Sequence, residues 1–194
     1  MIEARCLAEE ESMKTVCVIL ANGCEEVEAI TPIDYLRRAG TKVLVAGLGS
    51  REIVGGHGIA IAADEVLDDI DNEDFDCIVV PGGGEGSKAI AADPVAVAMI
   101  KRHASKGRLI SAICAAPAVV LGQACGLLAG RRFTCYPGME KLVHGARFED
   151  TRVVVDGDLI TARAAGCAGE FSAAIVQALL GGIKADELRS SVLL

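Results

Sequence analysis

Basic side chains are scarce in this 194-residue sequence. Its 19 lysines and arginines stand against 27 aspartates and glutamates, which gives a formal net charge of −8. A protein that grips nucleic acid needs a basic surface, and so does one that docks electrostatically on anionic lipid. No nucleic-acid partner and no membrane partner are therefore expected.

The eight cysteines also lack the spacing of a metal or redox motif. They stand at positions 6, 17, 24, 77, 114, 125, 135 and 167, and no two form a C-x-x-C pair. A zinc ribbon and a thioredoxin-like redox centre are therefore excluded, and no metal is expected. Disulfide frameworks belong to small secreted chains with weak cores, whereas 52% of this chain is hydrophobic. Any one cysteine is best interpreted as a small buried hydrophobic residue.

An export signal is absent as well. The first twelve residues are acidic and have no apolar central region, so residues 1–13 are interpreted as an extension before a single domain, 14–194. Residues 109–130 carry no charge and are numerous enough to span a bilayer, but Pro117 and two glycines interrupt them. A strand, a sharp turn and a buried helix explain this stretch better. A cytoplasmic location is expected.

Strand-like and helical patterns alternate along the chain, which predicts one α/β domain with a largely parallel sheet. Core strands are predicted at 15–20, 42–46, 77–80 and 108–111, hairpins within 47–63 and 153–161, and helices over 25–39, 93–104 and 168–180. Ligands of such sheets bind beyond the carboxyl ends of the strands. The candidate loops are therefore 21–28, 81–86 and 111–117.

Cys114 lies where a predicted buried strand runs into a helix, in the sequence LISAICAAP. A side chain on such a tight turn is exposed in the manner of a nucleophile elbow. The helix N-terminus favours a thiolate, and its free N–H groups can hold an oxyanion. The alternative is a buried turn cysteine without chemistry, and the residues alone leave both open.

Three acids follow the first strand in the sequence GCEEVE. For Glu25 and Glu26, complementation of the helix dipole is the preferred interpretation. Glu28 stands among apolar neighbours and is expected to face inward. A carboxylate beside a thiolate is disfavoured, so a protonated Glu28 is expected to donate a hydrogen bond to Cys114 and keep its thiol pKa below that of a free cysteine.

A glycine-rich loop, Pro81 to Gly86, follows the third core strand. Its spacing matches neither a P-loop nor a dinucleotide-binding fingerprint, so no nucleotide and no other cofactor is expected. The glycines are expected to let backbone N–H groups approach a substrate oxygen.

Longer stretches resemble one known family. The motifs are VILANGCEEVEAITPIDYLRRAG, VVPGGG, SAICAAPAVVL, TCYPG and the segment 163–166. They are similar to the ThiJ/PfpI superfamily, in the branch of the parkinsonism-associated deglycase and the bacterial YajL protein, from about Lys14 to Leu194. The resemblance implies a flavodoxin-like three-layer sandwich with a mostly parallel central sheet, and a homodimer.

The resemblance also implies residue roles. Cys114 matches the reactive, oxidation-prone nucleophile, and Glu28 matches its carboxyl partner. Gly83 and Ala115 match positions whose backbone N–H groups line the oxyanion site, with Gly82 beside them.

Two departures from the family pattern stand out. Tyr136 occupies the place of a histidine that some relatives carry near the nucleophile, so Tyr136 is expected to supply the polar contact there. The segment 163–166 lacks the glycine and proline that relatives often have after the arginine, which is expected to reshape the pocket rim. His57 is interpreted as a solvated loop residue, and His103 and His144 as structural.

The function implied first is conversion of 2-oxoaldehydes such as methylglyoxal to hydroxy acids without glutathione, or deglycation of methylglyoxal adducts. Cys114 would be the nucleophile and Glu28 the proton shuttle, acting on a small aldehyde or a glycated substrate. The alternative is an oxidative-stress sensor or chaperone that acts through oxidation of Cys114. A cysteine peptidase is disfavoured because no histidine matches the position beside the cysteine.

Overall fold

A computed structural model describes residues 13–194, so the extension predicted at residues 1–13 lies almost wholly outside it. The centre of the fold is a seven-stranded sheet in the order β10-β11-β7-β6-β1-β2-β5. Its strands are β1 (Thr15–Leu20), β2 (Lys42–Gly47), β5 (Glu65–Val66), β6 (Cys77–Val80), β7 (Leu109–Ile113), β10 (Val153–Asp156) and β11 (Leu159–Ala162). All neighbouring strands are parallel except β10 and β11, which form the hairpin predicted at 153–161.

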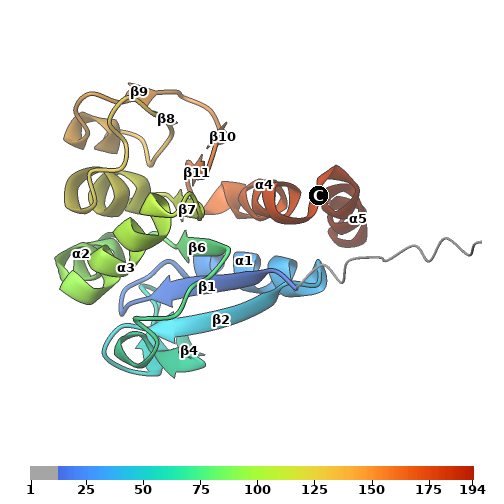
Figure 1. The fold of residues 1–194 in the computed structure, drawn as a ribbon, viewed down its shortest axis with the longest axis horizontal. Coiled ribbons are helices and arrows are strands. Elements are labelled where there is room, and N and C mark those ends of the chain that lie inside the picture. The colour runs from blue at the N-terminus through green and yellow to red at the C-terminus, as the bar shows by residue number, and fades with distance from the viewer. Residues whose placement is uncertain (1–12) are drawn as a thin grey trace, which may run out of the picture.

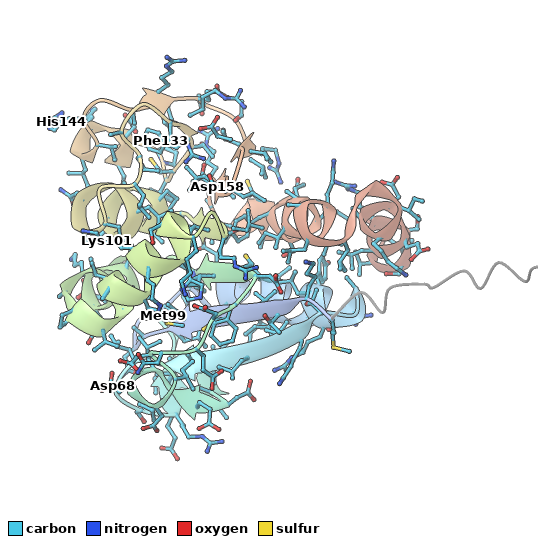
Figure 2. All side chains as sticks on the ribbon, viewed as in Figure 1. Asp68, Met99, Lys101, Phe133, His144 and Asp158 are labelled. Carbon is cyan, nitrogen blue, oxygen red and sulfur yellow. The ribbon has the colours of Figure 1, made fainter. Side chains whose placement is uncertain are left out.

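Helices cover both faces of the sheet, which confirms the three-layer sandwich (Figure 1). On one face lie α1 (Glu26–Arg38), α4 (Ala168–Leu180) and α5 (Gly182–Val192), and on the other lie α2 (Gly84–Ala92), α3 (Pro94–Ser105) and the π-helix η2 (Pro117–Ala124). Short 3-10 turns complete the helical segments: η1 (Leu67–Asp69), η3 (Met139–Leu142) and η4 (Ala165–Cys167). Figure 2 shows Met99 of α3, a fully buried side chain of the second face.

The strands alternate their side chains between these two layers, as strand geometry requires. In β1, Val16 and Val18 pack in the first layer, while Cys17 and Ile19 pack in the second. Because both faces are covered, the strand reads as a continuous apolar run, which is why it could be predicted from sequence.

Two small sheets lie outside the central one. The first is the hairpin of β3 (Glu52–Val54) and β4 (Ala60–Ala62), within the range predicted for it. The second pairs β8 (Arg132–Phe133) with β9 (Arg147–Phe148).

Asp93 and Pro94 set the start of α3, which lies in the range predicted for a helix. The Asp93 side chain accepts a hydrogen bond from the backbone N–H of Ala96 at 2.8 Å, and Pro94 is the first helical residue.

Two helices were not predicted. The sequence predicts a loop over residues 81–86, yet α2 begins at Gly84. The sequence also predicts that the helix over 168–180 closes the chain, yet α5 follows it.

The charge-free residues 109–130 contain β7, the turn at Cys114 and η2, which confirms the strand, sharp turn and buried helix predicted there. Within residues 13–194, no helix combines the length and apolar character that crossing a bilayer requires.

The strand order places a topological switch between β1 and β6. The chain leaves β1 toward β2 on one side, whereas β6 and β7 follow on the other. Parallel α/β sheets bind ligands beyond the carboxyl ends of strands at such a point. The three candidate loops follow β1, β6 and β7 and therefore meet at this edge.

Candidate active site

Direct contacts join the three candidate loops. The backbone N–H of Glu25 donates to the carbonyl oxygen of Gly82 at 3.1 Å, and the N–H of Gly82 donates to Glu28 Oε2 at 2.9 Å. A Cβ atom built on Gly82 would lie 2.6 Å from Cys114 Cβ. The structure thus brings Cys114, Glu28 and Gly82 together, as the sequence predicted.

Cys114 has a strained backbone that fits a nucleophile elbow. Its φ is +66°, a left-handed conformation that costs a residue with a side chain about 1–2 kcal/mol. Two hydrogen bonds hold it there: its N–H donates to the Ala162 carbonyl at 2.9 Å, and its carbonyl accepts from the N–H of Tyr136 at 2.8 Å. Strain held this firmly by neighbouring backbone is typical of functional sites.

Accessibility separates Cys114 from the other cysteines. Of the seven cysteines that the structure describes, all are free thiols and all but Cys114 are buried. The interpretation of the others as packing residues is confirmed for Cys17 and Cys77 in the strands and also for Cys24 and Cys135 in loops.

Glu28 is completely buried, as expected, and one of its oxygens is unpaired. Oε2 accepts the N–H of Gly82, whereas Oε1 has no hydrogen-bond partner among residues 13–194. Burial raises the pKa of Glu28 to about 7, against the lowering influence of the Cys114 thiol and the Gly82 N–H. A carboxyl poised in this way can hold or release a proton near neutral pH.

The thiol and the carboxyl influence each other's titration. Burial, followed by the charge of Glu28, raises the pKa of Cys114 to about 12, while the backbone N–H groups of Gly83 and Ala115 lower it. The expectation of a lowered thiol pKa is therefore wrong, because burial disfavours the thiolate and the charge of Glu28 adds to this effect. Between about pH 7 and about pH 12, Cys114 and Glu28 together hold one proton. The thiol is ionised only when that proton is on Glu28.

The glycine at position 83 is required by geometry. Its φ is +88°, and a Cβ there would lie 2.4 Å from the carbonyl oxygen of Gly23. Only glycine lets this backbone approach so closely. Its N–H and that of Ala115 lie close enough to the Cys114 sulfur to lower the pKa of the thiol.

Tyr136 reaches Cys114 through its backbone and not through its phenol. Its ring is 49% exposed, and its hydroxyl forms no hydrogen bond with a residue in the described part of the chain. The expected polar contact of the hydroxyl is therefore not formed. At the rim, Arg163 pairs with Asp150 at 2.8 Å, one residue beyond the Ala162 carbonyl that anchors Cys114.

None of the chain's three histidines, all within the described residues, contacts Cys114. His103 is buried, and its ring bonds the backbone of Phe75 and Met99, which confirms a structural role. His144 is exposed at the outer edge of the molecule (Figure 2), so a structural role is wrong for it.

His57 is exposed but not merely solvated. Its Nδ1 lies 2.7 Å from Glu26 Oε2 and 3.5 Å from Glu25 Oε2. These three side chains are the described group whose ligand atoms are close enough, within 4.8 Å, to share a metal ion. Sequence reasoning missed the contact because the residues stand 31 positions apart and meet only when the β3–β4 hairpin folds over α1.

Groove size alone does not identify this site. A surface groove of about 660 Å³ runs along α5 and is lined by Ile183, Asp186 and neighbouring residues. No cysteine lines this groove. The candidate active site is therefore identified by the chemistry of Cys114 and Glu28 and not by the volume of a groove.

Known proteins resemble this chain over most of its length. A profile of the DJ-1/PfpI family matches residues 14–178. The protein dj-1beta of Drosophila melanogaster is 40% identical over 93% of this chain and 97% of its own. The glutathione-independent glyoxalase DJR-1.2 of Caenorhabditis elegans is 36% identical over 91% of this chain and 95% of its own. The DJ-1 homolog B of Arabidopsis thaliana is 42% identical over 91% of this chain, which spans only 41% of that relative.

Solved structures share the fold. Drosophila melanogaster DJ-1beta superposes with a TM-score of 0.90 at 38% identity, covering 94% of this chain and 99% of that one. Oxidised DJ-1 of Toxoplasma gondii superposes equally well, with a TM-score of 0.90 at 34% identity over 93% and 98% of the two chains. These matches confirm the resemblance seen in the sequence motifs. The chain belongs to the DJ-1/PfpI family.

Proposed function

We propose that this protein converts 2-oxoaldehydes such as methylglyoxal to hydroxy acids without glutathione. The observation that carries the proposal is the unpaired, buried Oε1 of Glu28 next to a partly exposed Cys114 on a strained turn. A nucleophile and a proton carrier with a pKa near 7 are the two groups that the chemistry needs. The similarity to a glutathione-independent glyoxalase supports the same activity.

The reaction follows from the single proton that the pair shares. With the proton on Glu28, the Cys114 sulfur adds to the aldehyde carbon, and the new oxyanion takes that proton to give a hemithioacetal. The N–H groups of Gly83 and Ala115 stabilise the oxyanion. The Glu28 carboxylate then removes the hydrogen of that carbon as a proton, and the ketone oxygen takes up a proton, which gives an enediol. Glu28 returns its proton to the former ketone carbon while the hydroxyl next to the sulfur loses its proton, which leaves a thioester of a hydroxy acid. Water hydrolyses the thioester and restores the thiol.

Lactate formation from methylglyoxal without glutathione tests this function. We expect Cys114→Ala to lose the activity, and Glu28→Gln to slow it about 100-fold or more, because the proton carrier is gone. Cys125→Ala and Glu85→Gln are matched controls, since Cys125 is a buried thiol at the end of η2 and Glu85 is an exposed acid on α2. Undiminished lactate formation by Cys114→Ala would contradict the proposal.

Deglycation of methylglyoxal adducts on proteins or nucleotides would use the same thiol and acid. A small aldehyde needs only access to the partly exposed Cys114, whereas an adduct brings a protein or nucleotide that must also be accommodated at the surface. The glyoxalase reaction is therefore the primary proposal, and a glycated substrate is the secondary one.

Oxidation of Cys114 is the second candidate, as in an oxidative-stress sensor or chaperone. Cys114 is the described cysteine that peroxide can reach, and a protonated Glu28 could hydrogen-bond a sulfinate oxygen. The structural match to an oxidised DJ-1 is consistent with this chemistry.

Mass spectrometry after mild peroxide treatment tests the second candidate. We expect a selective gain of two oxygens on Cys114 that Glu28→Gln diminishes. Oxidation spread evenly over the cysteines would show that the site is not tuned for peroxide.

We further propose that the protein is a cytoplasmic homodimer. Its support is an exposed apolar surface beside the site, formed by Val27 and Ile30 of α1 with Val54 and Ile59 of the hairpin.

A further inference from the structure

The tip of the β3–β4 hairpin is built around one buried carboxylate. Glu26 is 4% exposed, and its Oε1 accepts the backbone N–H groups of His57 at 2.7 Å and Ile59 at 3.4 Å. Its Oε2 faces the His57 ring at 2.7 Å. A Cβ on Gly55 would lie 2.3 Å from the Glu26 carboxyl carbon, so the tip can close over Glu26 only with glycine at that position.

The same hairpin is hydrogen-bonded to the loop 22–25, which precedes Glu28. The N–H of Gly56 donates to the Cys24 carbonyl at 2.8 Å, and the N–H of Gly23 donates to the Val54 carbonyl at 2.8 Å. The hairpin tip thus packs against one side of the loop 22–25.

The other side of this loop touches the glycine-rich segment of the active site. Cβ atoms on Gly83 and Gly86 would lie 2.4 Å from the Gly23 carbonyl oxygen and 2.8 Å from the Cys24 nitrogen. The two loops are also joined by hydrogen bonds, from the N–H of Gly86 to the Gly23 carbonyl at 3.3 Å and from the N–H of Glu25 to the Gly82 carbonyl at 3.1 Å. In packing this tight, a shift of the hairpin would displace the backbone of Gly83, whose N–H lies near the Cys114 sulfur.

The His57 ring faces two acidic side chains. Among residues 13–194, the charged groups that face the ring are Glu25 at 3.5 Å and Glu26 at 2.7 Å, both acidic. The hydrogen bond of Glu26, followed by the charges of Glu25 and Glu26, raises the pKa of His57. The hydrogen bond of the His57 ring and the backbone N–H groups lower the pKa of Glu26 to about 2. A neutral imidazole can still donate one hydrogen bond but loses the Coulombic attraction to both acids.

We propose that Glu26 and His57 are positioning residues whose ion pair holds the loop 22–25, and through it Gly83 and Glu28, against Cys114. Loss of the His57 proton loosens the clamp and lowers the reactivity of the thiol. The inference concerns the geometry of the Cys114 site and does not depend on which substrate that site converts.

Alkylation of Cys114 by iodoacetamide, site-resolved by mass spectrometry, tests the clamp without any turnover. His57→Arg supplies a permanent cation that can pair with the two acids, and His57→Gln removes the charge. Because Glu28 is unchanged in all three proteins, its own titration cancels in their rate ratios. We expect the ratio of wild type to His57→Arg to be near one at pH 6 and to fall about threefold by pH 9, because misplaced catalytic groups react more slowly. His57→Gln should be slow at both pH values.

The midpoint of that fall should coincide with the imidazole titration of His57 measured by NMR. His144→Gln, at an exposed histidine with no ion pair among the described residues, is the matched control and should follow wild type throughout. A constant ratio from pH 6 to 9, while NMR shows His57 losing its proton, would overturn the proposal. A change of melting temperature without a pH-dependent ratio would also overturn it, since it would mark the pair as merely structural.

Discussion

Gly82 occupies the narrowest point between the nucleophile and its carboxyl partner. A Cβ there would lie 2.5 Å from Glu28 Oε2 and 2.6 Å from Cys114 Cβ. Both are closer than real Cβ contacts allow, so any side chain at this position must push the two reactive groups apart. The separation of thiol and carboxyl is therefore set by a residue that has no side chain.

We expect Gly82→Ala to slow methylglyoxal conversion about 100-fold, since a displacement of about 1 Å in a catalytic group has an effect of that order. Gly84→Ala is the control, because nothing lies within 4 Å of a Cβ at Gly84. Lactate production and the thermal unfolding of both variants would be compared. Equal activity of the two variants would show that the site tolerates a wider spacing.

Residues that carry local signals could be predicted from the sequence. Cys114 follows an apolar strand-like run and precedes Pro117, and Glu28 stands among apolar residues. The neighbouring sequence therefore identifies both positions as candidates. The pairing of Glu26 with His57 could not be predicted, because it depends on how the β3–β4 hairpin packs against α1 in the tertiary structure. The prediction of a lowered thiol pKa was wrong because burial of Cys114, which the local sequence does not encode, raises that pKa, and the charge of Glu28 raises it further.

At the scale of elements, His103 joins α3 to the segment before β6. Its Nε2 accepts the N–H of Phe75 at 2.9 Å, and its Nδ1 faces the Met99 carbonyl at 2.9 Å, so the proton must sit on Nδ1 and the ring is neutral. Burial lowers the pKa of His103 below its usual 6.5. His103 is therefore protonated more readily in the unfolded chain than in the folded protein. The contribution of neutral His103 to stability is complete above pH 6.5 and is lost as the pH falls below that value.

We expect His103→Leu to lower the free energy of unfolding by about 1–3 kcal/mol at pH 8, because the Phe75 N–H is left buried without a partner. The loss should shrink at pH 5.5, where the wild type has itself been weakened. Urea unfolding at both pH values measures the difference, with His144→Leu as the exposed control. An equal loss at both pH values would mean that His103 does not titrate in the unfolding reaction.

Elements with strong patterns were predicted, and elements with weak patterns were not. The core strands have continuous apolar runs, and α3 has an aspartate cap followed by proline. By contrast, α2 begins in a run of glycines that indicates a loop, and Gly181–Gly182 reads as the end of the last helix although α5 starts there. Their existence depends on packing against the sheet and on neighbouring helices, which local sequence does not encode.

At the scale of the whole molecule, the surface around α1 is unusually apolar for an exposed helix. Val27 is 49% exposed and Ile30 45%, and the neighbouring hairpin adds Val54 at 50% and Ile59 at 57%. Exposed apolar side chains that gather on one surface favour association. A second copy of the chain is the partner that we propose for it.

We expect Ile30→Glu to shift the protein to monomers, because a charge would be buried at the contact. Sedimentation equilibrium measures the mass. Val155→Glu is the matched control, since Val155 is 46% exposed on β10, away from α1. A wild-type protein that sediments as a monomer would contradict the dimer, and an unchanged dimer in Ile30→Glu would place its interface elsewhere.

The two helical layers each contribute part of the active site. Glu28 stands on α1, which packs on one face of the sheet, whereas Gly83 precedes α2, which packs on the other. A chain with only one layer docked would hold a thiol without its carboxyl, or without its backbone N–H groups. Recovery of activity during refolding should therefore lag behind the recovery of helical circular dichroism and report the moment when the second layer docks.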